Sequence, residues 1–283
     1  MKFELLLCAF CALCVDTGTS SSAAAPLPPP YLWLEKYDPA ESIAARIPPP
    51  AGYQRAAAAA GSFEGWLRGL PLKKGNPPVR LFDGREKPNQ AAHWAVLDID
   101  TGTRDLQQCA DAIIRLRAEF LYAPAKYGEI HFNFTSGDRA DFSRWLAGFT
   151  PTVRGSKVAW TPGRPRPDTR AAFRAYLDVV FTYAGTASLA KELKPVPDVR
   201  QMRARDVFIQ GGSPGHVVIV VDMAADPATG RRAFLLAQGY MPAQDMHILR
   251  NPASSSGPWY DLDFGQTLRT PEWTFAAGDL RRF

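Results

Sequence analysis

The stretch Asp105-Leu-Gln-Gln-Cys-Ala-Asp-Ala-Ile-Ile-Arg-Leu-Arg-Ala-Glu-Phe-Leu-Tyr122 carries the strongest structural pattern in this chain of 283 residues. One set of residues recurs at the spacing of a single helix face and is apolar: Cys109, Ile113, Leu116 and Phe120. A second row alternates in charge: Asp111, Arg115 and Glu119. The pattern predicts a helix that packs on the core, with Arg115 and Glu119 as an ion pair that is either buried or solvated.

The helix is predicted to begin just after Asp105. The Asp105 side chain can accept hydrogen bonds from the first free amides, and Gln108, three residues later, can complete a capping box. Cys109 then falls just inside the first turn, where the positive end of the helix dipole favours a thiolate, an effect that fades within about one turn. The cysteine is therefore either a reactive thiol or a buried core residue.

The N-terminal residues predict export. Lys2 precedes eleven apolar residues from Leu5 to Val15, and small residues follow from Ser20 to Ala25, which is the pattern of a cleaved signal peptide. Eleven residues are too few for a membrane-spanning helix, which needs about 20. We therefore expect a signal peptide over residues 1–25, a periplasmic or extracellular location, and no transmembrane helix in the mature chain.

Cysteine usage follows from this prediction. Removal of residues 1–25 takes away three of the four cysteines and leaves Cys109 as a single thiol without a disulfide partner. A free thiol in an oxidising compartment is a liability unless it is buried or used. Either interpretation of Cys109 has to account for that.

The composition is that of a globular protein, with 46% hydrophobic and 22% charged residues. A formal net charge of +5 suits contact with anionic partners such as cell-wall glycan or peptide. The Lys and Arg residues are scattered, and no basic stripe with interleaved aromatic residues predicts binding of nucleic acid. Proline runs at 26–30 and 48–50 predict a tether over residues 26–52, in which Trp33, Leu34 and Tyr37 can dock onto a single domain formed by residues 53–283.

The second half of the chain predicts a sheet. Residues 206–209, 216–222 and 233–238 have the pattern of neighbouring antiparallel strands, with a glycine-rich turn at 211–215. The middle strand is apolar almost throughout, so it is expected to be buried on both faces. Further helices are expected near 62–70, 142–149, 169–183 and from 188, the second of them capped by residues 135–138. The expected fold class is α+β, an antiparallel sheet packed against the helix that bears Cys109.

A cysteine at a helix start and a histidine at a strand start are two of the parts that a thiol nucleophile needs. His216 would take the proton from Cys109, and a third polar group would orient the ring. Gln238, at the end of the next predicted strand, is the first candidate for that group because an amide oxygen can fix the histidine tautomer. Gln244 and His247 are substitutes.

The same reasoning needs donors for an oxyanion, the negatively charged oxygen that forms when a thiolate attacks a carbonyl. The side chains of Gln107 and Gln108 are candidates, as is the backbone amide of Cys109.

Two segments resemble the NlpC/P60 branch of the papain-like cysteine peptidases: Asp206-Val-Phe-Ile-Gln210 and Gly211-Gly-Ser-Pro-Gly-His216-Val-Val-Ile-Val220. In that family a strand, a glycine turn and a His-bearing strand follow one another. The resemblance implies a papain-like fold and cleavage of peptide bonds in bacterial cell walls, with Cys109 as nucleophile, His216 as base and Gln238 as the orienting group. The family usually has Asp-Cys-Ser-Gly where this chain has Gln108-Cys109-Ala110-Asp111.

A second resemblance runs over most of the mature chain. The segments that carry it are Asp105–Asp111, Arg115–Glu119, Gly211–His216, Gln238–Gln244 and Thr270-Pro-Glu-Trp-Thr-Phe275. They resemble an uncharacterised family of bacterial exported proteins, a domain of unknown function. This resemblance implies a family and no activity.

Two other functions stay open. A transglutaminase-like acyl transferase uses the same cysteine and histidine but normally has an aspartate as third residue, and Asp222 lies at the far end of the His216 strand. If Cys109 is a core residue, the chain is a non-catalytic exported binding or envelope-assembly module. The four histidines lack the spacing of metal ligands, so neither a metal nor a cofactor is predicted.

Overall fold

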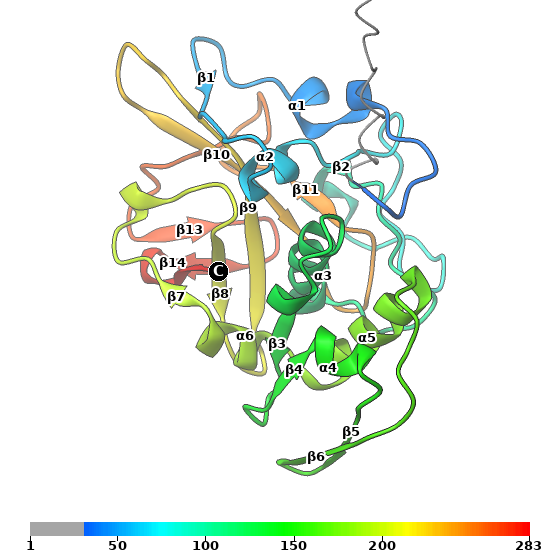
Figure 1. Cartoon of the computed structure of the whole chain (residues 1–283). Helices are drawn as coiled ribbons and strands as arrows, with labels where there is room; N and C mark the ends of the chain where they lie inside the picture. The colour runs from blue at the N-terminus through cyan, green and yellow to red at the C-terminus, as the bar shows by residue number, and fades with distance from the viewer. Residues whose placement is uncertain (1–30) are drawn as a thin grey trace, which may run out of the picture.

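An antiparallel sheet organises the chain, as a computed structural model that describes residues 31–283 shows (Figure 1). Within these residues the sheet has nine strands, seven of them in the order β2-β11-β10-β9-β8-β15-β7, while β1 pairs with β9 and β12 with β10. The strands are β1 Gln54–Arg55, β2 His93–Val96, β7 Lys194–Pro195, β8 Val207–Gln210, β9 His216–Ala225, β10 Arg232–Gln238, β11 His247–Leu249, β12 Tyr260–Asp261 and β15 Leu280–Arg282. The expected combination of helices with an antiparallel sheet is confirmed.

The central strand is β9, which pairs antiparallel with β8 and β10 as predicted. It is buried from its first residue, His216, through Ala224. Val217 and Ile219 belong to the apolar cluster beneath the helices, whereas Val218 and Val220 belong to a second cluster on the other face of the sheet. Because successive side chains of a strand point to opposite faces, an unbroken apolar run is what a strand covered on both faces requires.

Helices cover one face of the sheet and a small sheet covers the other (Figure 1). The helices are α1 Ile43–Arg46, α2 Phe63–Arg68, α3 Cys109–Tyr122, α4 Phe142–Leu146, α5 Arg170–Tyr183 and α6 Thr186–Glu192. Short 3-10 helices are η1 Pro39–Glu41, η2 Gln90–Ala92, η3 Tyr127–Glu129, η4 Val199–Gln201 and η5 Ala277–Asp279. The two-stranded sheets are β3 His131–Asn133 with β4 Arg139–Asp141, β5 Thr150–Arg154 with β6 Lys157–Thr161, and β13 Thr267–Arg269 with β14 Thr274–Ala276.

Helix α3 begins at Cys109, later than predicted. Its N-cap is Gln108, whose backbone N–H donates to the Asp111 carboxylate at 3.1 Å. Asp105 has a different role from the predicted cap. Its Oδ1 accepts from the backbone N–H of Ala243 at 2.7 Å and from Nε2 of Gln108 at 2.9 Å, so it ties the loop after β10 to the start of α3.

The charged row of α3 is buried, which resolves the open question about the ion pair. Arg115 is 1% exposed and its Nε donates to Glu119 at 2.7 Å. Arg170 of α5 donates to both oxygens of Glu119, at 2.6 and 2.8 Å. The pair is therefore an element of the contact between α3 and α5 and not a solvated surface pair.

Two other expectations differ from the structure, and a third cannot be compared with it. Residues 135–138 form a turn between β3 and β4, and the N-cap of α4 is Asp141. The described part of the predicted tether, residues 31–52, is packed onto the domain: the hydroxyl of Tyr31 donates to Trp66 O and Trp33 Nε1 donates to Asp98 O, both at 2.7 Å. Its buried aromatic and isoleucine side chains outweigh the proline-rich composition. The predicted signal peptide lies outside the described residues.

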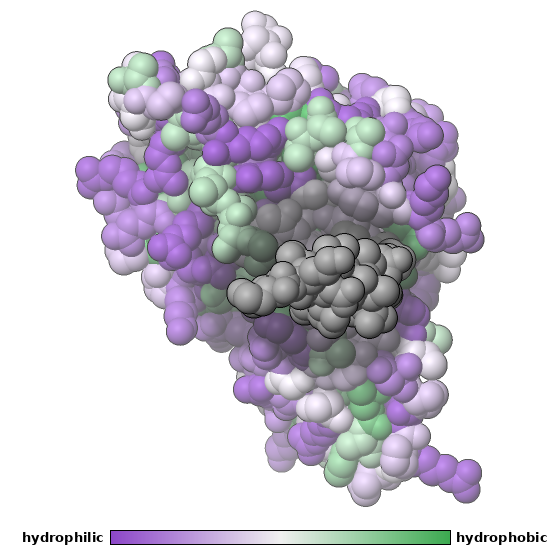
Figure 2. Space-filling model, turned by 45° about the horizontal axis from the view of Figure 1, so that its top comes forward, coloured by the Kyte–Doolittle hydropathy of each residue, from purple (hydrophilic) through white to green (hydrophobic). Residues whose placement is uncertain are grey.

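The surface drawn in Figure 2 is mainly hydrophilic, with hydrophobic side chains in small separate groups. Among residues 31–283, no helix is both long and apolar enough to cross a membrane.

Gly239, directly after β10, should be sensitive to substitution because it lies against the start of α3. A Cβ atom there would lie 2.8 Å from the Ala112 Cβ and 3.0 Å from the Gln108 carbonyl oxygen. We expect Gly239→Ala to lower the free energy of unfolding by about 1–3 kcal/mol, the usual range for overpacking, as measured by urea denaturation. Gly278→Ala is the control, since no atom lies within 4 Å of its Cβ position. Equal denaturation midpoints for the two variants would show that the residues around Gly239 move aside for a methyl group without loss of stability.

Candidate active site

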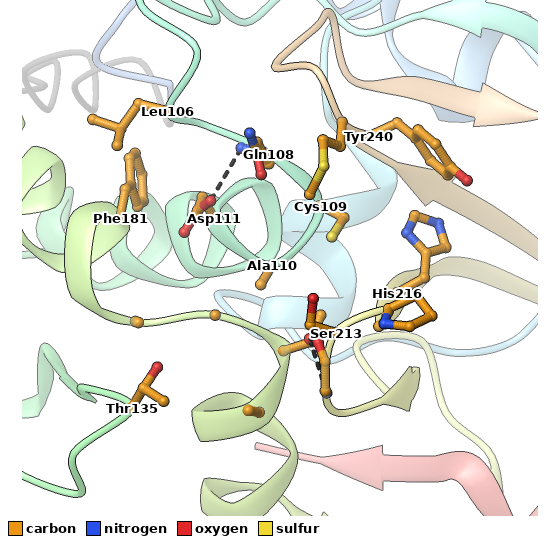
Figure 3. A pocket seen from close by; sticks show the side chains of 18 of the residues that line it. Leu106, Gln108, Cys109, Ala110, Asp111, Thr135, Phe181, Ser213, His216 and Tyr240 are labelled. Atoms are coloured by element: carbon orange, nitrogen blue, oxygen red, sulfur yellow. Dashed lines mark hydrogen bonds between the residues drawn. The ribbon is translucent and has the colours of Figure 1, made fainter. Parts of the chain in front are cut away.

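A pocket of about 1030 Å³ lies where the start of α3, the turn before β9 and the segment between α5 and α6 meet (Figure 3). Cys109, Ser213, His216 and Tyr240 line it. Each comes from the end of a helix or strand or from a loop, so elements far apart in the sequence bring these side chains together.

Cys109 and His216 share one part of this pocket, as Figure 3 shows. The His216 and Tyr240 ring centroids are 4.7 Å apart. Burial, followed by the charges of Glu272 and Cys109, raises the pKa of the Tyr240 hydroxyl. Burial raises the pKa of the Cys109 thiol, and the groups that act in the opposite direction include the backbone N–H of Val217, the residue after His216. The predicted nucleophile and base therefore lie in one site.

The His216 ring is held by Gln238, the residue expected to orient it. His216 Nε2 and Gln238 Oε1 are 2.8 Å apart, and both side chains are buried. Antiparallel pairing explains the meeting, because His216 begins β9 and Gln238 ends the neighbouring strand β10.

The surrounding hydrogen bonds define the tautomer of His216. His247 Nδ1 lies 3.0 Å from the Asp245 carbonyl oxygen, which can only accept, so His247 carries its proton on Nδ1 and its Nε2 accepts from Gln238 Nε2 at 3.2 Å. Gln238 Nε2 donates its second hydrogen to Glu272 Oε2, with 2.8 Å between the two atoms. Gln238 Oε1 is thus the acceptor for the N–H of His216 Nε2.

His216 therefore has an unprotonated Nδ1, which makes no hydrogen bond within the part of the chain that the structure describes. A neutral imidazole protonated on Nε2 presents a lone pair on Nδ1. This is the nitrogen that can take a proton inside the pocket.

Two residues of this network were missed in the sequence. Lys87 Nζ lies 2.8 Å from Glu272 Oε1 and 4.7 Å from the centroid of the Tyr240 ring. Lys87 also donates to Oε1 of Gln244 at 3.4 Å, so Gln244 is a partner of the lysine and not of the histidine. Glu272 belongs to the segment Thr270–Phe275 that carried the family resemblance, and this was its only signal. Nothing near Lys87 in the sequence pointed to a site.

The thiol and the imidazole are both neutral at pH 7. Burial and the charge of Asp111 raise the pKa of the Cys109 thiol to about 11, although the nearby backbone amides act in the opposite direction. Burial lowers the pKa of His216 to about 4, against the effects of the Gln238 hydrogen bond and the Glu272 charge. The expected preference for thiolate at the helix start is thus outweighed by burial and by a carboxyl two residues away.

Of the candidate donors for an oxyanion, the Gln107 side chain lies outside the pocket and the Gln108 side chain lines it. Gln107 is buried outside the pocket, where its Oε1 accepts from Arg115 at 3.0 Å and from Arg174 at 3.2 Å. Gln108 does line the pocket, with its Nε2 bonded to Asp105. The backbone amide of Cys109 is at the first position of α3, where an N–H has no acceptor within the helix.

Asp222 is far from this site. It is buried near the other end of β9, where Arg68 donates to it at 2.8 Å and Arg55 forms a second ion pair with it. Both arginines come from the N-terminal part of the domain. The carboxylate serves as the partner of these two cations.

A protein-family model described as a domain of unknown function (4846) matches residues 43–282. The chain belongs to this family. The resemblance to an uncharacterised family is thereby confirmed. Comparisons with curated proteins and with solved structures found no match.

The raised pKa of Cys109 should be visible in its alkylation by iodoacetamide. At pH 7.5 we expect the folded protein to react about tenfold more slowly than the urea-unfolded chain, because a hundredfold loss of thiolate is partly offset by the greater nucleophilicity of a more basic thiolate. The rate should keep rising with pH up to about 10, as followed by mass spectrometry of the peptide that contains Cys109. A rate that levels off below pH 8 would contradict a buried neutral thiol.

Proposed function

We propose that this protein is an exported thiol hydrolase of papain-like type that cleaves an amide bond through a thioester on Cys109. The observation that carries the proposal is the His216 ring, whose Nε2–H is held by Gln238 while Nδ1 stays unprotonated in the pocket that contains the thiol. Buried polar atoms are usually hydrogen-bonded, and Nδ1 of this buried ring has no bond within residues 31–283, which supports a role for Nδ1 in the reaction.

In the first half of the reaction, His216 Nδ1 takes the proton of the Cys109 thiol as the sulfur attacks the carbonyl carbon of the substrate. The negative charge passes to the carbonyl oxygen, which the backbone N–H of Cys109 can stabilise. The C–N bond then breaks, and the proton moves from Nδ1 to the departing amine. The product of this half is an acylated Cys109.

In the second half, a water molecule attacks the thioester carbonyl and gives its proton to His216 Nδ1. The C–S bond breaks, the carboxylic acid leaves, and the sulfur regains its proton from the imidazolium. The same step with an amine in place of water would transfer the acyl group.

The residues behind His216 support the charge that appears on the ring. When Nδ1 is protonated, the positive charge is shared with the Nε2–H, which Gln238 Oε1 accepts at 2.8 Å. Glu272 lies behind the same amide and adds a negative charge that favours the imidazolium. Because thiol and imidazole start neutral, proton transfer accompanies attack on the substrate and does not precede it.

Export and a cell-wall peptide substrate are part of the proposal. The pattern of residues 1–25 and the resemblance of residues 206–220 to NlpC/P60 peptidases support both, and the net charge of +5 is compatible with an anionic envelope polymer.

The competing function is a non-catalytic exported module. The observation in its favour is that Cys109 belongs to the main apolar cluster and is only 8% exposed. The transglutaminase-like alternative gains no such support, because the two arginine partners of Asp222 keep it near the opposite end of β9 from His216.

Site variants separate these functions. With cell-wall muropeptides as substrate and mass spectrometry of the products, Cys109→Ala should abolish cleavage, since no thioester can form. His216→Ala should reduce the rate by about a thousandfold or more, because it removes the base. Gln238→Ala should reduce the rate by about tenfold to a hundredfold, because the imidazole is still present but no longer held in the tautomer with an unprotonated Nδ1.

His131→Ala is the matched control, a partly exposed histidine that pairs with Glu192 and does not line the pocket. It should keep the wild-type rate. Cleavage that survives in Cys109→Ala, or wild-type protein that binds muropeptides without cleaving them, would favour the binding module.

A further inference from the structure

Asp111 is a buried carboxyl group that the reaction above does not use. It lies on the first turn of α3, lines the same pocket as Cys109 and is 6% exposed (Figure 3). Its Oδ2 accepts from the backbone N–H of Gln108 at 3.1 Å. Its Oδ1 is buried and has no hydrogen-bond partner within residues 31–283.

The other fully buried carboxylates of the domain are paired with cations. Glu119 meets Arg115 and Arg170, and Asp206 meets Arg282 at 2.7 Å. Within residues 31–283 Asp111 has no such partner, and burial raises its pKa to about 7. A half-satisfied buried carboxylate is unfavourable, and because Asp111 lines the pocket, a bound ligand is a group that could supply the missing donor to Oδ1.

The pocket suits a cation. Its lining residues include two carboxylates, Asp105 and Asp111, and no Lys or Arg of the described chain, although the protein as a whole carries a net charge of +5. A positively charged group would be attracted to this site and an anionic group repelled.

The geometry of Asp111 narrows the choice of cation. Oδ2 already accepts one hydrogen bond, from the Gln108 amide, while Oδ1 has no partner within residues 31–283, so the two oxygens are not equally free for a ligand that needs both. A guanidinium binds carboxylates best through two parallel hydrogen bonds to both oxygens, whereas an ammonium acts as a point charge that one oxygen can hold.

We propose that Asp111 binds a primary ammonium group of the substrate, so that the enzyme selects peptides with a free amino group close to the acyl group that Cys109 attacks. This inference rests on the proposed hydrolase function and adds its specificity. It also links binding to reactivity, because the Asp111 charge is one of the two factors that hold the thiol protonated. An ammonium beside Asp111 offsets that charge and makes the thiol more acidic when a correct substrate is bound.

Two matched electrophiles test the proposal on the full chain: alanyl-alanyl chloromethyl ketone with a free amino group, and its N-acetylated form. The readout is the rate at which each alkylates Cys109 at pH 7.5, measured by mass spectrometry. Wild-type protein should react at least about tenfold faster with the free-amine reagent. Asp111→Asn should bring the ratio of the two rates to about one, and Asp138→Asn, a turn acid outside the pocket, should leave it unchanged.

Equal rates for the two reagents in the wild type, or a preference that persists in Asp111→Asn, would overturn the proposal. Should Asp111→Asn fail to fold, the wild-type preference itself decides, because it has to increase from pH 6 to about pH 7 as Asp111 ionises, before the amino group of the reagent, with a pKa of about 7.7–8, loses its proton. A preference that is constant or falls over this range counts against Asp111.

A second measurement keeps this inference separate from catalysis. In Cys109→Ala, alanyl-alanine amide should shift the backbone NMR signals of the first turn of α3 and its N-acetylated form should not. Such binding without any muropeptide cleavage by the wild type would refute the hydrolase and keep the ammonium site. Cleavage without a difference between the two ligands would do the opposite.

Discussion

The buried amide of Gln238 is the interaction on which the candidate site depends. Its side chain is inaccessible to water, so each of its polar atoms needs a partner inside the protein, and each has one: His216, His247 and Glu272. Because the Asp245 carbonyl can only accept, the direction of every hydrogen bond in this chain follows from it. The backbone carbonyl of Asp245 thus determines which nitrogen of His216 is left unprotonated.

The electrostatics of the pocket follow from burial more than from charge. Burial raises the pKa of the Cys109 thiol to about 11 and that of the Asp111 carboxyl to about 7, and it lowers the pKa of His216 to about 4. At pH 7 the thiol and the imidazole are therefore neutral, and Asp111 is about half ionised. In the proposed reaction, such a thiol is unreactive until a substrate binds beside it.

Much of the sheet could be predicted from the sequence, as could the elements that bring Cys109, His216 and Gln238 close together. Apolar runs and helical spacing are local signals, and they place these residues at the ends of elements that antiparallel pairing brings together. The same local signals misjudged the start of α3 and the cap at 135–138. There, side chains from other segments compete for the free amides, as Asp105 shows by bonding to Ala243 in the loop after β10.

By itself, the sequence determined the meander of β8, β9 and β10 and the helix that carries Cys109, because these depend on the periodicity of nearby residues. Only the tertiary structure decided that Cys109 and His216 line one pocket, that the thiol is neutral, that Glu272 and Lys87 join the network, and that Asp111 Oδ1 has no partner within residues 31–283. The physical reason is that pKa values and hydrogen-bond partners depend on burial and on charges brought close by folding, and Lys87 and Glu272 are separated in the chain by most of the domain. The spacing of residues along the sequence does not predict contacts between residues so far apart.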